Sequence, residues 1–457
     1  MKVSKDKLNV VLDIGKTNVK LIFLKNEKVV KEYKTKQKNE KFKNSIKTLK
    51  SRKIIDWLIK KLKKESRKNT LENFVCTTHG CSLAFIDFND KEIIACTDYE
   101  YNFDKYKKEF LKVQPRFSTS FTPLLEGGLN TGLQIFYLCK RFPKVLNKTK
   151  YILSYPQYVA WKLSKNYSTE ITYLGCHSFL WNFKKNQYSN LLKKLSVEKK
   201  FPPIKKAWDS IGHFTLNNNK INILNGVHDS NASYLYFLKS NLKNFTLVST
   251  GTWYIILNQQ TNIRKLKPNY DMLCGIDVFG KSVPTMRFMG GREYEFLCNK
   301  LKISKKNFKI SKIAIQDNLI LPSFASGGPF KINSSNLEAL LSLNNDERYS
   351  LICIYISFVL NFVLEQMNSK NTLILDGPLT KNNYIMNILA SIRNNQKTFK
   401  NKKEIGTGLG ASVLFNMKKQ NKLSLSAVKP TKKYNLSNIY KLWVNKIKKK
   451  NLFNINS

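Results

Sequence analysis

The chain lacks several features that would place it in common functional classes. None of its eight cysteines belongs to a C-x-x-C pair, so neither a thioredoxin-like redox motif nor a paired zinc site is indicated. No run reaches 18 apolar residues, and no apolar stretch precedes the first expected strand. No G-x-S-x-G segment occurs, which excludes a serine-hydrolase nucleophile elbow. We therefore expect a soluble, cytoplasmic enzyme with reduced core cysteines and no membrane partner.

Acidic residues are also scarce. The chain has 31 Asp and Glu against 79 Lys and Arg, which gives a formal net charge of +48. Such an excess ordinarily raises nucleic acid as a partner. The lysines are dispersed among many asparagines, however, and no zinc-finger spacing, RNP motif or basic heptad array occurs. Because a dispersed excess more often forms a solvated surface, nucleic-acid binding stays a weak alternative and not the expected main function.

The length of 457 residues exceeds the size at which one hydrophobic core usually stops growing. The hydrophobic content of 42% is sufficient for burial. We expect one domain over residues 1–222, a second over 223–415, and a basic tail over 416–457. Apolar residues at helical spacing in this tail indicate one docked helix.

Residues 9–24 have the pattern of a phosphate-binding hairpin. Two apolar runs flank a polar turn, Asp13 ends the first run, and Gly15 permits the tight reversal. Three residues with donor groups follow at the tip: Lys16, Thr17 and Asn18. Asp13 is placed to hold a hydrated Mg²⁺, which binds few carboxylates and keeps several waters. A P-loop is excluded because Val10 stands where that motif requires a glycine.

A second hairpin of the same plan is expected over residues 245–257. Its turn, residues 249–252, contains Gly251 and Thr252 between two apolar runs. Two similar hairpins indicate two related domains that face one nucleotide.

Together with other segments, these hairpins resemble the FGGY carbohydrate kinases, within the actin-like, hexokinase-like and Hsp70-like ATPase superfamily. The resemblance covers about residues 7–415, and the matching segments follow in the expected order. The further segments are Thr78-His79-Gly80, residues 226–232 around Asp229, residues 376–382 of an adenosine motif, and the glycine-rich residues 406–411. The resemblance implies an α/β, two-domain actin-like fold with ribonuclease H-like domains, and a sugar kinase activity.

The resemblance also assigns roles to residues and implies ATP and Mg²⁺ as cofactors. Asp229 would be the general base that takes the proton of the sugar hydroxyl, and a helix N-cap is its alternative role. The nucleotide would be bound by Asp13, Gly15, Lys16, Thr17, Asn18, Gly251, Thr252, Gly377, Asn382 and Gly408, with Asp13 on the metal. The sugar would be contacted by His79, Gly80, His177, His228, Ser230 and Arg287. The three histidines could instead be structural, and a solvent-exposed salt bridge is an equal explanation of Arg292 and Glu293.

Two departures from the family pattern bear on the substrate. Gly377-Pro378 stands where many members carry two glycines, and His228-Asp229-Ser230 is closer to the rhamnulokinase and fuculokinase branch. We expect a small ketose as the acceptor and ATP as the donor. The rival interpretation is an actin-like protein that binds nucleotide without sugar chemistry. The sequence leaves the oligomeric state open, and a homodimer is compatible with it.

Overall fold

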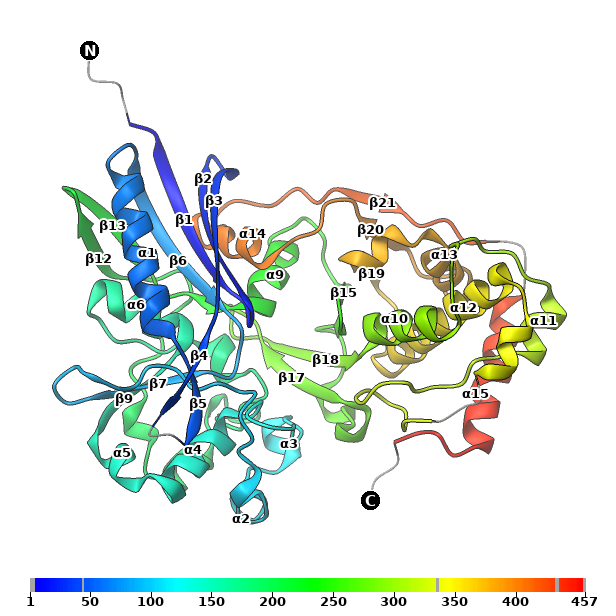
Figure 1. The fold of residues 1–457 in the computed structure, drawn as a ribbon, viewed down its shortest axis with the longest axis horizontal. Coiled ribbons are helices and arrows are strands. Elements are labelled where there is room, and N and C mark those ends of the chain that lie inside the picture. The colour runs from blue at the N-terminus through cyan, green and yellow to red at the C-terminus, as the bar shows by residue number, and fades with distance from the viewer. Residues whose placement is uncertain (1–4, 43–44, 334–336, 432–434, 455–457) are drawn as a thin grey trace. The chain divides into compact units, whose positions relative to one another are not determined.

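The computed structural model describes residues 5–42, 45–333, 337–431 and 435–454 (Figure 1). The chain divides into two compact units, which are described separately. The first comprises Met1–Asn241, Cys274–Ser282 and Ile405–Lys422, and the second comprises Leu242–Leu273, Val283–Glu404 and Leu423–Ser457. Each unit thus contains several segments of the chain, so a single cut near residue 222 does not describe the packing.

The first unit is built on a seven-stranded sheet with the order β12-β13-β6-β1-β2-β3, in which β14 also pairs with β6. Its strands are β1 (Lys7–Ile14), β2 (Asn18–Lys25), β3 (Lys28–Lys36), β6 (Thr70–Thr78), β12 (Ser210–Leu216), β13 (Asn219–Leu224) and β14 (Val227–His228). The antiparallel β1–β2 pair is the predicted first hairpin, and β3 pairs antiparallel with β2. β6 runs parallel to β1, and β14 runs parallel to β6. The carboxyl ends of β1, β6 and β14 therefore lie together at one edge of the sheet.

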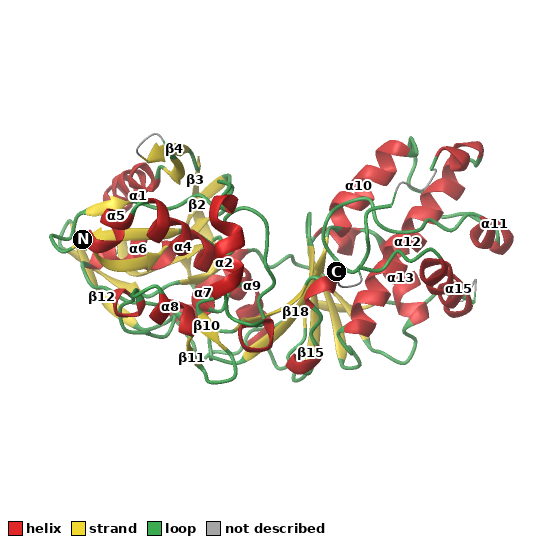
Figure 2. Cartoon of the chain, turned by 90° about the horizontal axis from the view of Figure 1, so that it is seen from below, coloured by secondary structure: helices red, strands yellow, loops and turns green. Residues whose placement is uncertain are grey.

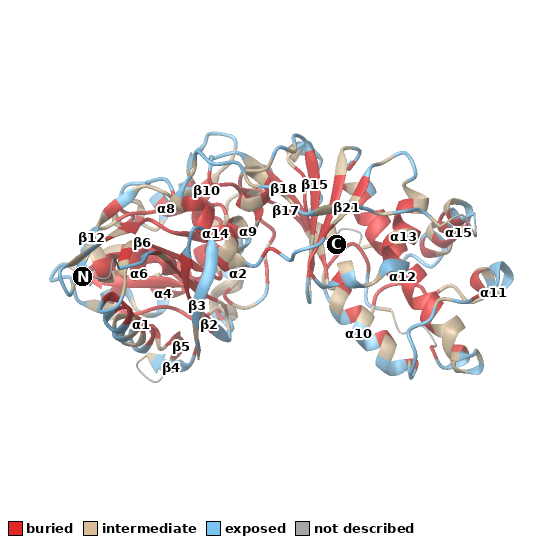
Figure 3. Ribbon diagram, turned by 90° about the horizontal axis from the view of Figure 1, so that it is seen from above, coloured by how far each residue is buried: buried red, intermediate tan, exposed pale blue. Residues whose placement is uncertain are grey.

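Alternate residues of β1 contribute to two different cores. Val10 and Leu12 pack with helices α1 (Ser51–Ser66) and α6 (Tyr155–Ser164) on one face. Val11 packs on the other face with α9 (Asp229–Leu238) and with residues that follow α14 (Thr407–Ser412). Since successive side chains of a strand point to opposite faces, a strand covered on both sides must be apolar throughout. β3 lies at the sheet edge and is exposed along most of its length (Figure 3).

A smaller sheet, with the order β8-β7-β9, belongs to the same unit. β7 (Leu83–Asp87) and β8 (Glu92–Ile94) form an antiparallel ribbon, and β9 (Thr149–Ser154) flanks β7. The other elements of this unit are β4 (Asn39–Phe42), β5 (Ile46–Leu49), β10 (Trp181–Asn182), β11 (Gln187–Tyr188), α2 (Lys107–Val113), α3 (Phe117–Ser120), α4 (Thr131–Arg141), α5 (Pro143–Lys148), α7 (Ile171–Leu174) and α8 (Asn190–Lys194).

One expectation about this unit is wrong. The polar sequence of residues 168–177 predicts an exposed loop, but Ser168, Thr169 and Glu170 are buried and α7 follows them. Ser168 Oγ donates to Asn225 Oδ1 over 2.7 Å, and Asn225 Nδ2 donates to Thr169 O over 3.2 Å. A polar segment can be buried where its groups bond internally, and hydropathy alone does not report such pairing.

The second unit contains a seven-stranded sheet with the order β17-β18-β16-β15-β19-β20-β21, and Figure 2 shows its helices beside these strands. The strands are β15 (Phe245–Thr250), β16 (Tyr254–Leu257), β17 (Met272–Ile276), β18 (Ser282–Phe288), β19 (Thr372–Asp376), β20 (Thr398–Asn401) and β21 (Leu425–Ala427). The helices are α10 (Gly290–Lys300), α11 (Lys312–Asp317), α12 (Asn345–Gln366), α13 (Asn383–Ile392) and α15 (Leu436–Lys449). The predicted second hairpin is the antiparallel pair β15–β16, and β19 runs parallel to β15.

Helix α12 is the central helix of this unit. A capping box between Asn344 and Glu347 begins it, and its apolar residues are buried on all sides. Within the described ranges it is the one helix long and apolar enough to cross a membrane, and 89% of the apolar window is buried inside the protein. α15 packs nearby through fully buried Trp443, whose indole Nε1 donates to Ile320 O over 2.8 Å.

Candidate active site

Asp13 lies where strand β1 ends, and its side chain is almost completely buried. The Thr407 hydroxyl, at the first residue of α14, donates to Asp13 Oδ2. Burial raises the pKa of Asp13, while the bond from Thr407 lowers it less. Gly408 packs beside this pair, since a Cβ there would lie 2.4 Å from Ile22 Cδ1 and 3.7 Å from Asp13 Oδ2. The fold thus brings together two predicted residues, Asp13 and Gly408, from opposite ends of the chain.

The turn between β1 and β2 has the predicted tight geometry. Gly15 N–H donates to Asn18 O over 2.9 Å, and Thr17 and Asn18 are exposed at the tip. Two of the predicted phosphate-binding residues are therefore accessible at the tip of the turn.

Lys16, a predicted phosphate-binding residue, pairs with carboxylates of the protein. Its ammonium donates to Asp98 Oδ1 and lies 3.3 Å from Glu100 Oε2 and 4.6 Å from the centre of the Tyr99 ring. Burial alone would raise the pKa of Asp98, but the bonds from Lys16 and from the Glu100 N–H lower it. Lys16 is therefore part of an ion pair with a fully buried carboxylate. Sequence reasoning missed Asp98, because no motif marks it.

His79 and Gly80 follow the end of β6. His79 is buried, and its Nδ1 donates to Gly80 O over 2.9 Å, so the remaining nitrogen Nε2 is the acceptor of the neutral ring. Burial lowers the pKa of His79, which keeps the ring neutral. In the part of the chain that the structure describes, Nε2 is buried without a hydrogen-bond partner. An unpaired acceptor of this kind suits a hydroxyl group of a ligand.

Asp229 is the first residue of α9, directly after β14. Because β14 pairs with β6, His228 lies opposite Thr78 and close to His79 in the sheet. Asp229 Oδ1 accepts from the Ser230 N–H over 2.6 Å and lies 3.2 Å from His228 Nε2. Oδ2 accepts no hydrogen bond from the described residues, and the side chain is 26% exposed. The carboxylate is therefore oriented through one oxygen and accessible through the other.

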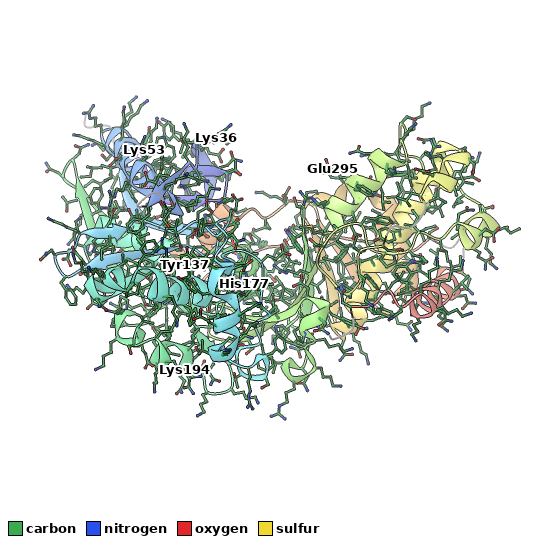
Figure 4. All side chains as sticks on the ribbon, turned by 60° about the horizontal axis from the view of Figure 1, so that its bottom comes forward. Lys36, Lys53, Tyr137, His177, Lys194 and Glu295 are labelled. Carbon is green, nitrogen blue, oxygen red and sulfur yellow. The ribbon has the colours of Figure 1, made fainter. Side chains whose placement is uncertain are left out.

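His228 is buried and contacts Cys176, whose Sγ lies 3.3 Å from His228 Nε2. Burial lowers the pKa of His228, but the negative charges of Cys176 and Asp229 outweigh it and raise the pKa to about 9. His177 is held separately, with Nδ1 2.7 Å from Leu129 O (Figure 4 labels it among the side chains of this unit). Sequence reasoning missed Cys176, although its position next to His177 was an available signal.

The second hairpin is supported by two close backbone approaches. A Cβ at Gly291, in the first turn of α10, would lie 2.0 Å from Gly251 O. Gly377 has a φ of +87°, and a Cβ there would lie 2.2 Å from Thr250 O. Since only glycine fits such positions, the expected adenosine motif lies against the turn of the second hairpin, residues 249–252. Leu379 N–H also donates to Thr250 Oγ1 over 3.1 Å.

A cavity of about 770 Å³ lies in the second unit beside this turn. Its wall includes three predicted residues, Gly251, Thr252 and Asn382. Four tyrosines and two lysines also line it: Tyr254, Tyr294, Tyr349, Tyr384, Lys306 and Lys381. A cavity of this size, with aromatic walls and a few polar groups, suits a small organic ligand such as a nucleoside.

Asn382 has a structural role in this wall. It is the N-cap of α13, and its Oδ1 accepts from the N–H groups of Tyr384 and Ile385 over 3.1 and 3.2 Å. Its Nδ2 donates to the Tyr349 hydroxyl over 3.0 Å. Asn382 therefore positions two of the tyrosines that line the cavity.

Arg287 and Glu293 are both engaged inside the second unit. Arg287 Nε donates to Asp271 Oδ1 over 3.0 Å, and its guanidinium lies 4.7 Å from the Trp253 ring centre. Glu293 is buried and accepts from the Phe324 N–H over 3.0 Å and from the Tyr355 hydroxyl over 2.5 Å. The exposed salt bridge considered for Glu293 is therefore wrong, because backbone and hydroxyl donors satisfy its carboxylate instead.

Comparison with known proteins finds a family model that matches part of the chain. Residues 242–423 match the family model described as carbohydrate kinase FGGY, C-terminal domain. No curated protein matches the chain in sequence.

Several solved structures share the fold. A carbohydrate kinase from Novosphingobium aromaticivorans is 24% identical, with 98% of this chain and 100% of that chain covered and a TM-score of 0.86. A xylulose kinase from Lactobacillus acidophilus is 14% identical, with 97% and 98% covered and a TM-score of 0.76. A glycerol kinase from Plasmodium falciparum is 15% identical, with 97% and 98% covered and a TM-score of 0.72. The domain match agrees with the predicted resemblance to the FGGY carbohydrate kinases, and the shared fold confirms the two-domain α/β prediction. The rhamnulokinase and fuculokinase branch stays a prediction.

Proposed function

We propose that this chain, whose residues 242–423 carry the C-terminal domain of an FGGY carbohydrate kinase, transfers the γ-phosphoryl group of ATP to a hydroxyl of a small ketose. The observation that carries this proposal is the setting of Asp229. Its carboxylate begins α9, is oriented through Oδ1 and is 26% exposed, and the neighbouring His228 lies opposite Thr78, the residue before His79, in the sheet.

Phosphoryl transfer to a sugar needs a positioned base and charge stabilisation more than covalent chemistry from the protein. Asp229 Oδ2 would take the proton of the sugar hydroxyl as its oxygen attacks the γ-phosphorus. His228 would keep Asp229 in place, since Nε2 of the charged ring lies 3.2 Å from Oδ1. Nε2 of neutral His79 would accept a hydrogen bond from a second hydroxyl of the sugar. The sugar would thus contact two acceptors, the ionised Asp229 carboxylate and the neutral His79 ring.

The tyrosine-lined cavity of the second unit would hold the nucleoside part of ATP. Its aromatic walls provide stacking surface, and Lys306 and Lys381 provide positive charge. The backbone of Gly251 and Thr252 lies at the same wall and would contact the phosphates.

The residues present fit the Mg²⁺ that such a kinase uses. Mg²⁺ is commonly bound by one or two carboxylates together with waters and substrate phosphates. Asp13 supplies one carboxylate, and Thr407 orients it through the bond to Oδ2. No group of three or more His, Cys, Asp or Glu suited to a metal occurs in the described residues, so the protein provides no closed cage. When bound, Mg²⁺ neutralises charge on the β and γ phosphate oxygens.

For the acceptor we propose a five- or six-carbon ketose such as L-fuculose, L-rhamnulose or a pentulose, in preference to glycerol. His79 provides an unpaired acceptor nitrogen and Asp229 provides an accessible carboxylate, which together suit a substrate with several hydroxyls. A buried polar site rejects analogues that lack a partner group, so a three-carbon polyol would leave part of it unsatisfied. The cytoplasm remains the proposed location.

The test is an ADP-release screen over ketoses, 6-deoxyketoses and polyols, with the parent enzyme and Asp229→Asn. The substitution keeps the shape and removes the base, so we expect kcat to fall by about 10²–10⁴-fold with nucleotide affinity nearly unchanged. Asp90→Asn is the matched control, since Asp90 lies exposed in the turn between β7 and β8. Retained turnover in Asp229→Asn would remove this residue from the mechanism. Nucleotide binding without sugar-dependent ADP release would favour a protein that lacks sugar chemistry, and glycerol as best substrate would refute the ketose assignment.

A further inference from the structure

A thiol lies next to the proposed base and has no part in phosphoryl transfer. Cys176 Sγ is 3.3 Å from His228 Nε2, and the same nitrogen is 3.2 Å from Asp229 Oδ1. His228 is therefore shared between a sulfur atom and the carboxylate that acts on the sugar. A change in charge or size at the sulfur would therefore alter the contact between the His228 ring and the Asp229 carboxylate.

The fold holds this sulfur in position. Gly80 gives it room, because a Cβ there would lie 2.9 Å from His228 Nε2 and 3.2 Å from Cys176 Sγ. Gly175, just before it, packs against Ile276, whose Cγ1 would lie 2.5 Å from a Cβ at that position. Thr172 Oγ1 accepts from the His228 N–H over 3.2 Å, which ties the Cys176 segment to β14.

The electrostatics distinguish Cys176 from the other partly exposed thiols. A hydrogen bond with the Cys81 thiol and the charges of His177 and His228 outweigh burial and lower the pKa of Cys176 well below its ordinary value. Burial raises the pKa of Cys139 to about 11 and also raises the pKa of Cys298. Because the thiolate is the reactive form, the three partly exposed cysteines should differ strongly in reactivity at neutral pH.

We propose that Cys176 is a modification site for hydrogen peroxide and for alkylating electrophiles, and that its modification stops sugar phosphorylation. With peroxide, the thiolate sulfur attacks one peroxide oxygen, an S–O bond forms and the O–O bond breaks. The sulfur is oxidised to sulfenic acid, the peroxide is reduced, and the leaving hydroxide takes a proton from His228 or solvent to become water. His228 then loses one of its two anionic partners, and the added oxygen enlarges the group that contacts the ring beside Asp229 Oδ1.

The reactivity of Cys176 is tested on the full chain without turnover. Limited iodoacetamide treatment at pH 7, followed by peptide mass spectrometry, should label Cys176 at least about 10-fold faster than Cys139 or Cys298. His228→Gln should slow labelling of Cys176 by a similar factor, because it removes the neighbouring cation. Equal labelling rates of the three thiols would overturn the proposal, as would unchanged labelling in His228→Gln.

The effect on catalysis rests on the proposed function and needs a separate assay. Peroxide should abolish sugar-dependent ADP release by the parent while nucleotide binding persists, and dithiothreitol should restore activity. Cys176→Ser should resist peroxide, whereas Cys139→Ser, the matched control, should be inactivated like the parent. Inactivation of Cys176→Ser at the parental rate would refute the link between the thiol and the base. Selective labelling of Cys176 without any sugar-dependent ADP release would refute the proposed function and leave the reactive thiol supported.

Discussion

Glu170 makes the stability of the first unit depend on pH. It is fully buried, and its Oε2 accepts from the Thr172 N–H over 2.9 Å and from the Thr172 hydroxyl. The other oxygen, Oε1, is buried without a partner among the described residues. Burial is the largest cause and raises the pKa of Glu170 from 4.5 to about 7. The folded protein therefore binds this proton more tightly than the unfolded chain does.

The size of the effect follows from this shift. A carboxyl whose folded pKa is raised contributes stability that is complete below pH 4.5 and is lost as the pH rises towards 7. Raising the pKa of Glu170 from 4.5 to about 7 corresponds to about 3 kcal/mol, because each tenfold change in proton affinity is worth about 1.4 kcal/mol. Glu170→Gln keeps an acceptor for Thr172 and cannot ionise, so it avoids this loss. For a unit of this size, we expect the Tm of the variant relative to that of the parent to be roughly 6 °C higher at pH 8 than at pH 5.

The assay compares thermal unfolding of the parent and Glu170→Gln at pH 5 and pH 8. Other groups also titrate in this range. The Tm difference between the variant and the parent is therefore determined at each pH, and the two differences are compared. Glu126→Gln is the control, because Glu126 is exposed in the same unit. A difference between parent and Glu170→Gln that is equal at the two pH values would refute the assignment of a buried, proton-binding Glu170.

Three further predictions concern ligands. Asp13→Ala should weaken Mg²⁺-dependent use of ATP, because the metal would lose its carboxylate, and equal activity across a Mg²⁺ titration would contradict this. Asn382→Ala should cost about 1 kcal/mol of stability through the lost N-cap and raise the KM for ATP more than the KM for the sugar. An unchanged KM for ATP in steady-state kinetics would argue against the tyrosine-lined cavity as the nucleoside site. Duplex DNA should bind only weakly and with steep salt dependence in a filter or fluorescence assay, and tight sequence-selective binding at physiological salt would contradict the compositional origin of the charge.

Local patterns in the sequence determined the regular elements and the class of the protein. Apolar runs on either side of Gly15 and Gly251 predicted both hairpins, because strand propensity and turn chemistry act over a few residues. The mostly apolar composition of residues 351–367 predicted a buried central helix for the same reason. The glycines at 377 and 408 were found through motif resemblance, and each lies where a side chain would clash with a neighbouring segment.

Only the tertiary structure decided which side chains meet. Thr407 reaches Asp13 across 394 positions of the chain, Lys16 pairs with Asp98 across 82, and Cys176 contacts His228 across 52. Such contacts depend on the parallel pairing of strands and on the helices that cover the sheet, and residue periodicity carries no information about either. The protonation states follow from the same packing, because burial and a neighbouring charge shift a pKa only once the chain is folded.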